Sequence, residues 1–241
     1  MPSEQILGVP VDVVTRESVL SAIEQEIEQR GRGGYIVAIN PEKVMAAQEQ
    51  EDVRRALEQA FLRIPDGIGV LWASRHLGGT IRSRVTGADL FEDVCALAAK
   101  RHWPVFLLGS RPGVAEEASG HLVQRFPGFV VAGAMHGYVK EEGWPEVLET
   151  IRGSGARLLF VAMGSPRQEK WLNRHFDATG ATIGFGIGGS LDALTGKVRR
   201  APRWAQQAGL EWLWRLILQP SRIGRQMALP RFAWRVLRDK S

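Results

Sequence analysis

Short apolar runs alternate with longer helical patterns along the first 197 residues, and this alternation constrains the fold more than any other feature. Five runs are short and rich in apolar or β-branched residues: 35–40, 105–108, 129–132, 158–162 and 181–185. Between them, helical spacing is found over 18–29, 52–62, 87–100, 113–125, 144–151 and 168–176. Strands that alternate with helices form βαβ units around a mostly parallel sheet. We therefore predict an α/β fold with a Rossmann-like, mostly parallel sheet flanked by helices.

Glycine follows several of the predicted strands and indicates where a ligand binds. Gly109, Gly133, Gly164 and Gly186 stand at or just after the ends of apolar runs. In doubly wound sheets, ligands bind beyond the carboxyl ends of the strands. Glycine there lets the backbone approach a phosphate, and the N-terminus of the next helix favours the anion. We expect the functional site at this edge of the sheet.

Positive charge is concentrated at the end of the chain. Residues 198–241 contain ten of the 31 Lys and Arg residues but only two of the 26 Asp and Glu residues, a balance of +8. The first 197 residues therefore carry −3. Four of the eight tryptophans also lie in this tail, and arginine mixed with tryptophan suits an anionic membrane surface or a phosphate-rich ligand. We predict a core over 1–197 and a basic helical appendage over 198–241. Charge alone leaves nucleic acid open, but the partner that we predict for the appendage is a membrane surface and not nucleic acid.

The appendage has the pattern of two short amphipathic helices. Leu210, Leu213, Trp214 and Ile217 recur at helical spacing, Pro220 interrupts, and a second stretch carries arginines at 231, 235 and 238. No segment reaches the roughly 18 apolar residues that a membrane span needs. We expect a cytoplasmic protein that is peripheral at the inner face of the cell membrane. An amphipathic tail also suits a partner subunit, so a homo-oligomer stays open.

Several common site types lack their motif. The chain has no Asp-x-Asp metal motif, no P-loop, and a single cysteine, Cys95, among apolar neighbours. The five histidines lack ligand spacing, and His136 is the best candidate among them for a role in binding. Residues 184–189 fit the dinucleotide pattern Gly-x-Gly-x-x-Gly, but no second strand with an acidic residue follows. A nucleotide-dependent oxidoreductase is therefore a minor alternative, and we predict neither metal nor cofactor.

Two stretches have the residue types for chemistry, and each has a purely structural alternative. Asp66, between Pro65 and Gly67, can be a general base facing a pocket, or part of a turn or a helix cap. Gln168 and Glu169 fall in the first turn of a predicted helix, where backbone N–H groups and an amide can meet a ligand. Ordinary helix capping explains Ser165, Pro166 and Glu169 equally well.

Taken in order, these stretches resemble the WecG/TagA/CpsF family of glycosyltransferases from about residue 5 to residue 235. The matching segments are Asn-Pro-Glu-Lys-Val at 40–44, Pro-Asp-Gly-Ile-Gly at 65–69, Arg-Val-Thr-Gly at 84–87, Phe-Leu-Leu-Gly at 106–109, His-Gly-Tyr at 136–138, Gly-Ser-Pro-Arg-Gln-Glu at 164–169, Gly-Ile-Gly-Gly-Ser-Leu-Asp at 186–192, Arg-Ala-Pro at 200–202 and Leu-Glu-Trp at 210–212 with Arg215. Each segment alone is weak evidence, but their common order is specific.

The resemblance implies an inverting, metal-independent transferase whose appendage helps to complete the site near the membrane. It implies a UDP-sugar donor, most often of N-acetylmannosamine, and a polyprenyl-diphosphate-linked sugar as acceptor, in teichoic acid or surface polysaccharide synthesis. Transfer of glucose or another hexose in exopolysaccharide synthesis is the alternative. A non-catalytic module that binds anions or membranes is a further alternative.

Site residues follow from the resemblance by position. The family's proposed base falls on Asp66, its pocket residues on Asn40 and Arg84, and its amide near the sugar and diphosphate on Gln168. The appendage arginines fall on Arg215, Arg222 and Arg225. Motif order places the substrate against Gly109, Ser110, His136, Gly137, Tyr138, Gly164, Gly186 and Asp192. One position departs from the family, because Ala38 stands where threonine is frequent, and this bears on the donor sugar.

Overall fold

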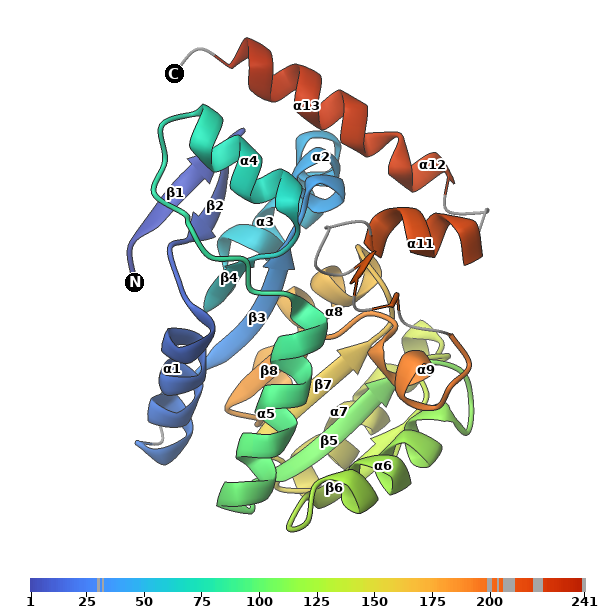
Figure 1. Ribbon diagram of the computed structural model, residues 1–241. Helices are drawn as coiled ribbons and strands as arrows, with labels where there is room; N and C mark the ends of the chain where they lie inside the picture. Colours follow the sequence, from blue (N-terminus) through green and yellow to red (C-terminus); the bar gives the residue numbers. More distant parts are fainter. Residues whose placement is uncertain are drawn as a thin grey trace.

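A computed structural model describes residues 1–29, 31, 33–198, 201–202, 204–205, 211–218 and 223–239. Its centre is a six-stranded parallel sheet in the order β4-β3-β8-β7-β5-β6 (Figure 1). The strands are β3 (Gly34–Ile39), β4 (Leu62–Pro65), β5 (Pro104–Gly109), β6 (Val130–Met135), β7 (Leu158–Ala162) and β8 (Ile183–Gly186). All six carboxyl ends therefore meet at one edge, as the α/β prediction requires.

Helices cover both faces of the sheet and bury two apolar clusters against it. One cluster joins inward residues of the strands to α1 (Arg16–Glu28), α5 (Gly87–Arg101) and α6 (Val114–Arg125). The other joins the opposite face to α2 (Pro41–Glu49), α3 (Glu51–Glu58), α7 (Trp144–Gly153) and α8 (Arg167–Thr179). The central strands are almost continuously apolar because both of their faces are buried.

The second layer continues beyond the sheet. The antiparallel hairpin of β1 (Ser3–Ile6) and β2 (Val9–Asp12) packs there with α4 (Ile68–His76) and α13 (Ala228–Arg238) (Figure 1). Phe232 and Val236 of α13 are fully or almost fully buried among residues of α2 and α4. The remaining short elements are η1 (Glu141–Gly143), α9 (Ser190–Leu194), α11 (Glu211–Leu218) and α12 (Ile223–Gln226).

Every predicted strand is present, but several boundaries were wrong. The helix expected over 52–62 ends at Glu58, and 62–65 is strand β4, whose Leu62 and Ile64 are buried against α1 and α5. Gly133 does not end a strand, because β6 runs on to Met135. A Cβ at Gly133 would lie 2.4 Å from Cε2 of Phe106, so this glycine makes room for a core ring.

Gly109, at the end of β5, gives a direct test of this packing. Its φ is +137°, and a Cβ there would lie 2.5 Å from the backbone carbonyl of Ala162. We expect Gly109→Ala to destabilise the fold by about 1–3 kcal/mol through backbone strain, and by a similar amount through overlap. Thermal unfolding measures the loss.

The control for this prediction is Gly120→Ala. Gly120 is exposed within α6, and an added Cβ meets nothing within 4 Å. Alanine there should stabilise the helix by roughly 0.5–1 kcal/mol. Equal melting temperatures for the two variants would contradict the role of Gly109.

Candidate active site

A cavity of about 910 Å³ opens at the carboxyl edge of the sheet. The segment after each of the six strands contributes to its wall, as do the start of α5 and parts of α6, α9, α11, α12 and α13. The cavity therefore lies at the sheet edge that glycine placement in the sequence predicted.

The described helices contain no segment long and apolar enough to cross a membrane.

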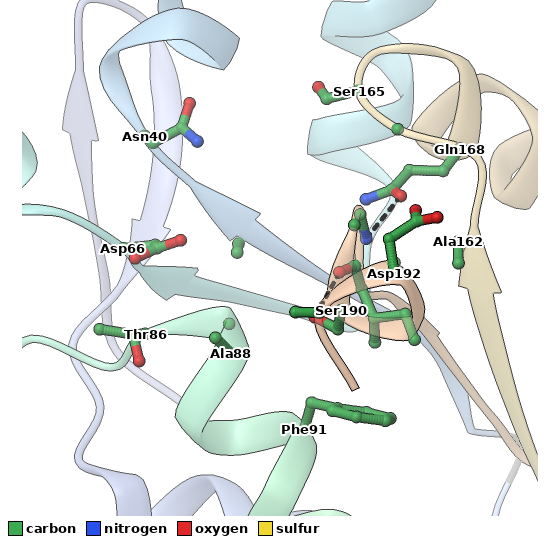
Figure 2. Close-up of a pocket in the computed structure, with 18 of the residues that line it drawn as sticks. Asn40, Asp66, Thr86, Ala88, Phe91, Ala162, Ser165, Gln168, Ser190 and Asp192 are labelled. Carbon is green, nitrogen blue, oxygen red and sulfur yellow. Dashed lines mark hydrogen bonds between the residues drawn. The ribbon is translucent and has the colours of Figure 1, made fainter. Parts of the chain in front are cut away.

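Asn40 and Asp66 form one wall because their strands are neighbours. β3 and β4 pair in parallel with Ile39 opposite Pro65, so the next residue of each strand, Asn40 and Asp66, emerges side by side (Figure 2). The Asp66 backbone N–H donates to the carbonyl of Ile39 at 2.8 Å. Asn40 Oδ1 accepts from the backbone N–H of Lys43 and caps α2.

The start of α5 approaches the same carboxylate. A Cβ on Gly87 would lie 3.8 Å from Asp66 Oδ2, and Thr86 caps the helix by accepting from the Asp89 N–H. The N-terminus of a helix favours negative charge, so this end of α5 suits an anion in the cavity. Arg84 precedes the helix and forms an ion pair of 3.3 Å with Glu211 of α11.

The opposite wall is made of loops after β5, β7 and β8. Gln168 reaches into the cavity from α8, and its Oε1 accepts from the Gly188 N–H at 2.9 Å (Figure 2). Asp192 of α9 accepts from the Ser110 hydroxyl at 3.3 Å. Ser110 has φ +55°, a left-handed conformation that is uncommon for serine and is frequent at functional sites.

A buried ion pair joins the two walls below the surface. Lys43 Nζ lies 2.7 Å from Glu169 Oε1, and the two side chains are only 5% and 1% exposed. Burial by itself would raise the pKa of Glu169. The nearby Lys43 ammonium and hydrogen bonds from Lys43 and Gln168 outweigh burial, so the pKa lies below its ordinary value. Glu169 is thus an ionised carboxylate inside the protein.

Most of the residues predicted for the site do lie together. The cavity wall contains Asn40, Asp66, Arg84, Ser110, Gly137, Tyr138, Gly164, Gln168, Gly186, Asp192 and Arg225. Gly109 and His136 are not part of that wall, and the Nδ1 atom of His136 is buried without a partner among the described residues.

The predicted appendage residues are described only in part. Arg225 lines the cavity together with Glu211, Trp212, Gln226 and Leu229, so α11, α12 and α13 all reach it. Arg215 belongs to α11, but its side chain lies outside the described residues, as do Arg222 and Arg200, the first residue of the matched segment 200–202.

The capping roles considered for Asp66 and Glu169 were wrong, and one contact of the site was missed. Gly67, not Asp66, stands at the N-cap of α4. Pro166 does stand at the N-cap of α8, whereas Glu169 lies fully buried. Lys43 and Glu169 were not predicted to meet, because they stand on helices far apart in the chain. The only signal for this contact in the sequence is that each residue lies in the first turn of a helix that follows a strand.

The cavity can hold a nucleotide and a second polar substrate and offers a carboxylate for proton transfer. Its wall presents glycine backbone, helix N-termini and the arginines 84, 111, 125, 167 and 225 to negative charge. Among the described residues, no three His, Cys, Asp or Glu side chains gather to hold a metal ion. Metal independence stays a prediction.

The comparisons with known proteins cover the whole chain. The sequence model described as "Glycosyl transferase WecG/TagA/CpsF family" matches residues 4–241. A protein of Bacillus subtilis (strain 168) is 31% identical over 240 residues, which span 100% of this chain and 93% of that protein. Its name is N-acetylglucosaminyldiphosphoundecaprenol N-acetyl-beta-D-mannosaminyltransferase.

Proposed function

Since this chain belongs to the WecG/TagA/CpsF family, and is therefore a glycosyltransferase, we propose that it transfers N-acetylmannosamine from a UDP donor to a polyprenyl-diphosphate-linked sugar. The named relative acts on N-acetylglucosaminyldiphosphoundecaprenol, which supports this class of acceptor. The reaction belongs to the synthesis of a cell-surface polysaccharide or teichoic acid. We propose that neither a metal nor a cofactor takes part.

One observation carries the mechanism: the Asp66 carboxylate faces a cavity whose opposite wall is built from glycine loops. We assign the nucleotide to Ser110, Gly164, Gly186 and Asp192 on that wall. The acceptor hydroxyl then lies between the donor sugar and Asp66. This arrangement places a base on the side of the sugar opposite the leaving group.

In the proposed reaction, Asp66 accepts the proton of the acceptor hydroxyl, and the oxygen of that hydroxyl attacks the anomeric carbon of the donor sugar. The bond from that carbon to the UDP oxygen breaks in the same displacement, so the configuration inverts and UDP leaves. Negative charge that develops on the diphosphate is stabilised by Arg84, Arg225 and the N-termini of nearby helices. We assign Arg215 and Arg222 to the same role, on the donor or on the lipid diphosphate.

The appendage over 198–241 is proposed to bring the cavity to the inner face of the membrane. Exposed apolar side chains in its described part include Trp204, Trp212, Ile217, Ile223 and Trp234. On α13, arginines 231, 235 and 238 accompany Trp234, and such a mixture is typical of helices that lie on anionic membranes.

One position favours a second donor. Ala38 lines the cavity next to Gly87, because a Cβ on Gly87 would lie 3.4 Å from the Cβ of Ala38. Since alanine has no hydroxyl, position 38 cannot offer one to the sugar. The alternative donor is UDP-glucose or another UDP-hexose. The acceptor and the mechanism would be unchanged.

A product assay tests the proposal and separates the donors. The protein is incubated with synthetic polyprenyl-diphosphate N-acetylglucosamine and UDP-N-acetylmannosamine, UDP-N-acetylglucosamine or UDP-glucose, with and without EDTA. We expect turnover to be fastest with UDP-N-acetylmannosamine and unchanged by EDTA. Faster turnover with UDP-glucose would favour the alternative, and loss of activity in EDTA would reject metal independence.

A binding control excludes the other classes of function. UDP should raise the melting temperature, because a ligand that binds only the folded state stabilises it. NAD and single-stranded DNA should leave it unchanged. Stabilisation by either of these without UDP release would contradict the proposed function.

A further inference from the structure

We propose that Lys43 and Glu169 are positioning residues: their buried ion pair orients the amide of Gln168, and Gln168 holds the glycine loop at 186–190 against the cavity. The link to catalysis rests on the proposed function. The structural half, which concerns the loop, can be tested without the reaction.

The contacts form a continuous chain through the protein. Lys43 Nζ meets Glu169 Oε1 at 2.7 Å, and the same oxygen accepts from Gln168 Nε2 at 3.0 Å. Gln168 Oε1 then accepts from the Gly188 N–H at 2.9 Å. Gln168 is 2% exposed, so water offers little competition for these bonds. This series of contacts leads from α2 to the loop after β8.

The charge on Glu169 decides which way the Gln168 amide faces. An ionised carboxylate can only accept hydrogen bonds, so the amide must turn its nitrogen toward Glu169. Its oxygen is then directed at Gly188, which needs an acceptor. A reversed amide would place oxygen against carboxylate and NH₂ against a backbone N–H. Lys43 keeps the carboxylate ionised and thereby sets this orientation.

The glycine loop is shaped around the Gln168 side chain. A Cβ on Gly186 would lie 2.7 Å from Gln168 Nε2, so only glycine leaves room for the amide. Gly188 has φ +58°, in the left-handed region that favours glycine. This loop also lines the part of the cavity that we assign to the nucleotide. Movement of Gln168 should therefore be transmitted to the donor site.

At its other end, this series of contacts reaches the proposed base. Asn40 Oδ1 accepts from the Lys43 backbone N–H at 3.0 Å, and Asn40 emerges beside Asp66. The first turn of α2 thus holds both the cation and a neighbour of Asp66. The ion pair connects the two walls across which the sugar is transferred.

Stability alone does not require this pair. Desolvation of two buried charges commonly cancels their attraction, and apolar residues of similar volume often serve as well or better. Apolar residues cannot orient an amide, however. A buried pair that meets Gln168 therefore indicates a positioning role at the cavity.

The test replaces both charges with apolar side chains of similar size, as Lys43→Met/Glu169→Leu. Hydrogen exchange of the Gly188 amide is followed by NMR, and kcat and KM are measured for the UDP-sugar. We expect a folded protein whose Gly188 amide exchanges at least tenfold faster. We expect kcat to fall by about 10–10²-fold, because small misplacements of catalytic groups cost this much. We also expect KM for the UDP-sugar to rise, because the loop lines the part of the cavity that we assign to the nucleotide.

A matched control breaks a different buried pair. Asp12 is 1% exposed and forms an ion pair of 2.9 Å with Arg63, and neither residue lines the cavity. Asp12→Asn should lower the melting temperature but leave kcat and the exchange of Gly188 as in the wild type. A fall in kcat that follows stability alone would appear in this control as well.

Each outcome decides the proposal. Exchange at Gly188 and kcat both within twofold of the wild type in the folded double variant would overturn it. If that variant does not fold, Glu169→Asp keeps the charge but withdraws the carboxylate by one methylene. Faster Gly188 exchange in Glu169→Asp supports the proposal, and unchanged exchange rejects it. If the wild type releases no UDP, the proposed function fails, while the exchange measurement still decides whether the pair holds the loop.

Discussion

Asp66→Asn is expected to lower kcat by roughly 10²–10⁴-fold, the usual contribution of a general base. Asparagine keeps the size and shape of the side chain, and the backbone bond from residue 66 to Ile39 is unaffected. The amide cannot accept the proton of the acceptor hydroxyl, so the nucleophile is no longer activated. KM for the donor should change little, because the nucleotide is assigned to the opposite wall. Steady-state UDP release measures both constants.

The control is the same substitution at a carboxylate away from the cavity. Asp177 is exposed near the end of α8 and does not line the cavity, so Asp177→Asn should retain wild-type kcat. Near-normal turnover of Asp66→Asn would reject Asp66 as the base. A wild type that binds UDP but never releases it from a UDP-sugar would instead favour the non-catalytic module.

Periodicity predicted the central sheet because its inner strands are buried on both faces. A run such as 158–162 is apolar at every position, and all five of its residues are buried. The elements that were missed are short: β1, β2 and β4 have four residues each, and the helices α2 and α4 have nine each. β4 has four residues and follows a helix closely, so its two inward side chains resembled a continuation of that helix. The two strands of the hairpin at 3–12 are also only four residues long, too short for a clear alternation of apolar residues.

The edge that carries the site could be predicted, but the contacts within it could not. Asp66 and Asn40 meet because β3 and β4 are neighbours, and strand order is set by the packing of the whole sheet. Lys43 and Glu169 meet because α2 and α8 cover the same face. Glycine after a strand is a local signal, whereas the pairing of two buried charges depends on tertiary structure.

The second large effect is expected from Lys43→Met, which should destabilise the protein at neutral pH by about 3–5 kcal/mol. The substitution leaves the fully buried Glu169 without its ammonium partner, so a charge on this carboxyl is no longer compensated. For a chain of this size, each kcal/mol shifts the melting temperature by roughly 2–4 °C. Removal of both charges in Lys43→Met/Glu169→Leu should cost less than removal of Lys43 alone. Urea unfolding of the three proteins gives the comparison.

The pH dependence identifies Glu169 as the cause. In the wild type the pKa of Glu169 lies below its ordinary value, because the attraction of Lys43 outweighs burial. The stability from the pair is therefore complete above the pKa of the unfolded state and is lost as the pH falls through the lower pKa of the folded state. In Lys43→Met the largest remaining influence is burial, which raises the pKa of Glu169, and only the hydrogen bonds from Gln168 and Ser165 oppose it. We therefore expect this pKa to lie above its ordinary value. The charged carboxylate then costs stability at neutral pH, and this cost shrinks as the pH falls and the carboxyl is protonated. The difference in free energy of unfolding between wild type and Lys43→Met should therefore shrink as the pH is lowered from about 8 to about 5. A difference that stays constant over this range would mean that lost packing of the lysine side chain, and not an uncompensated charge, explains the loss of stability.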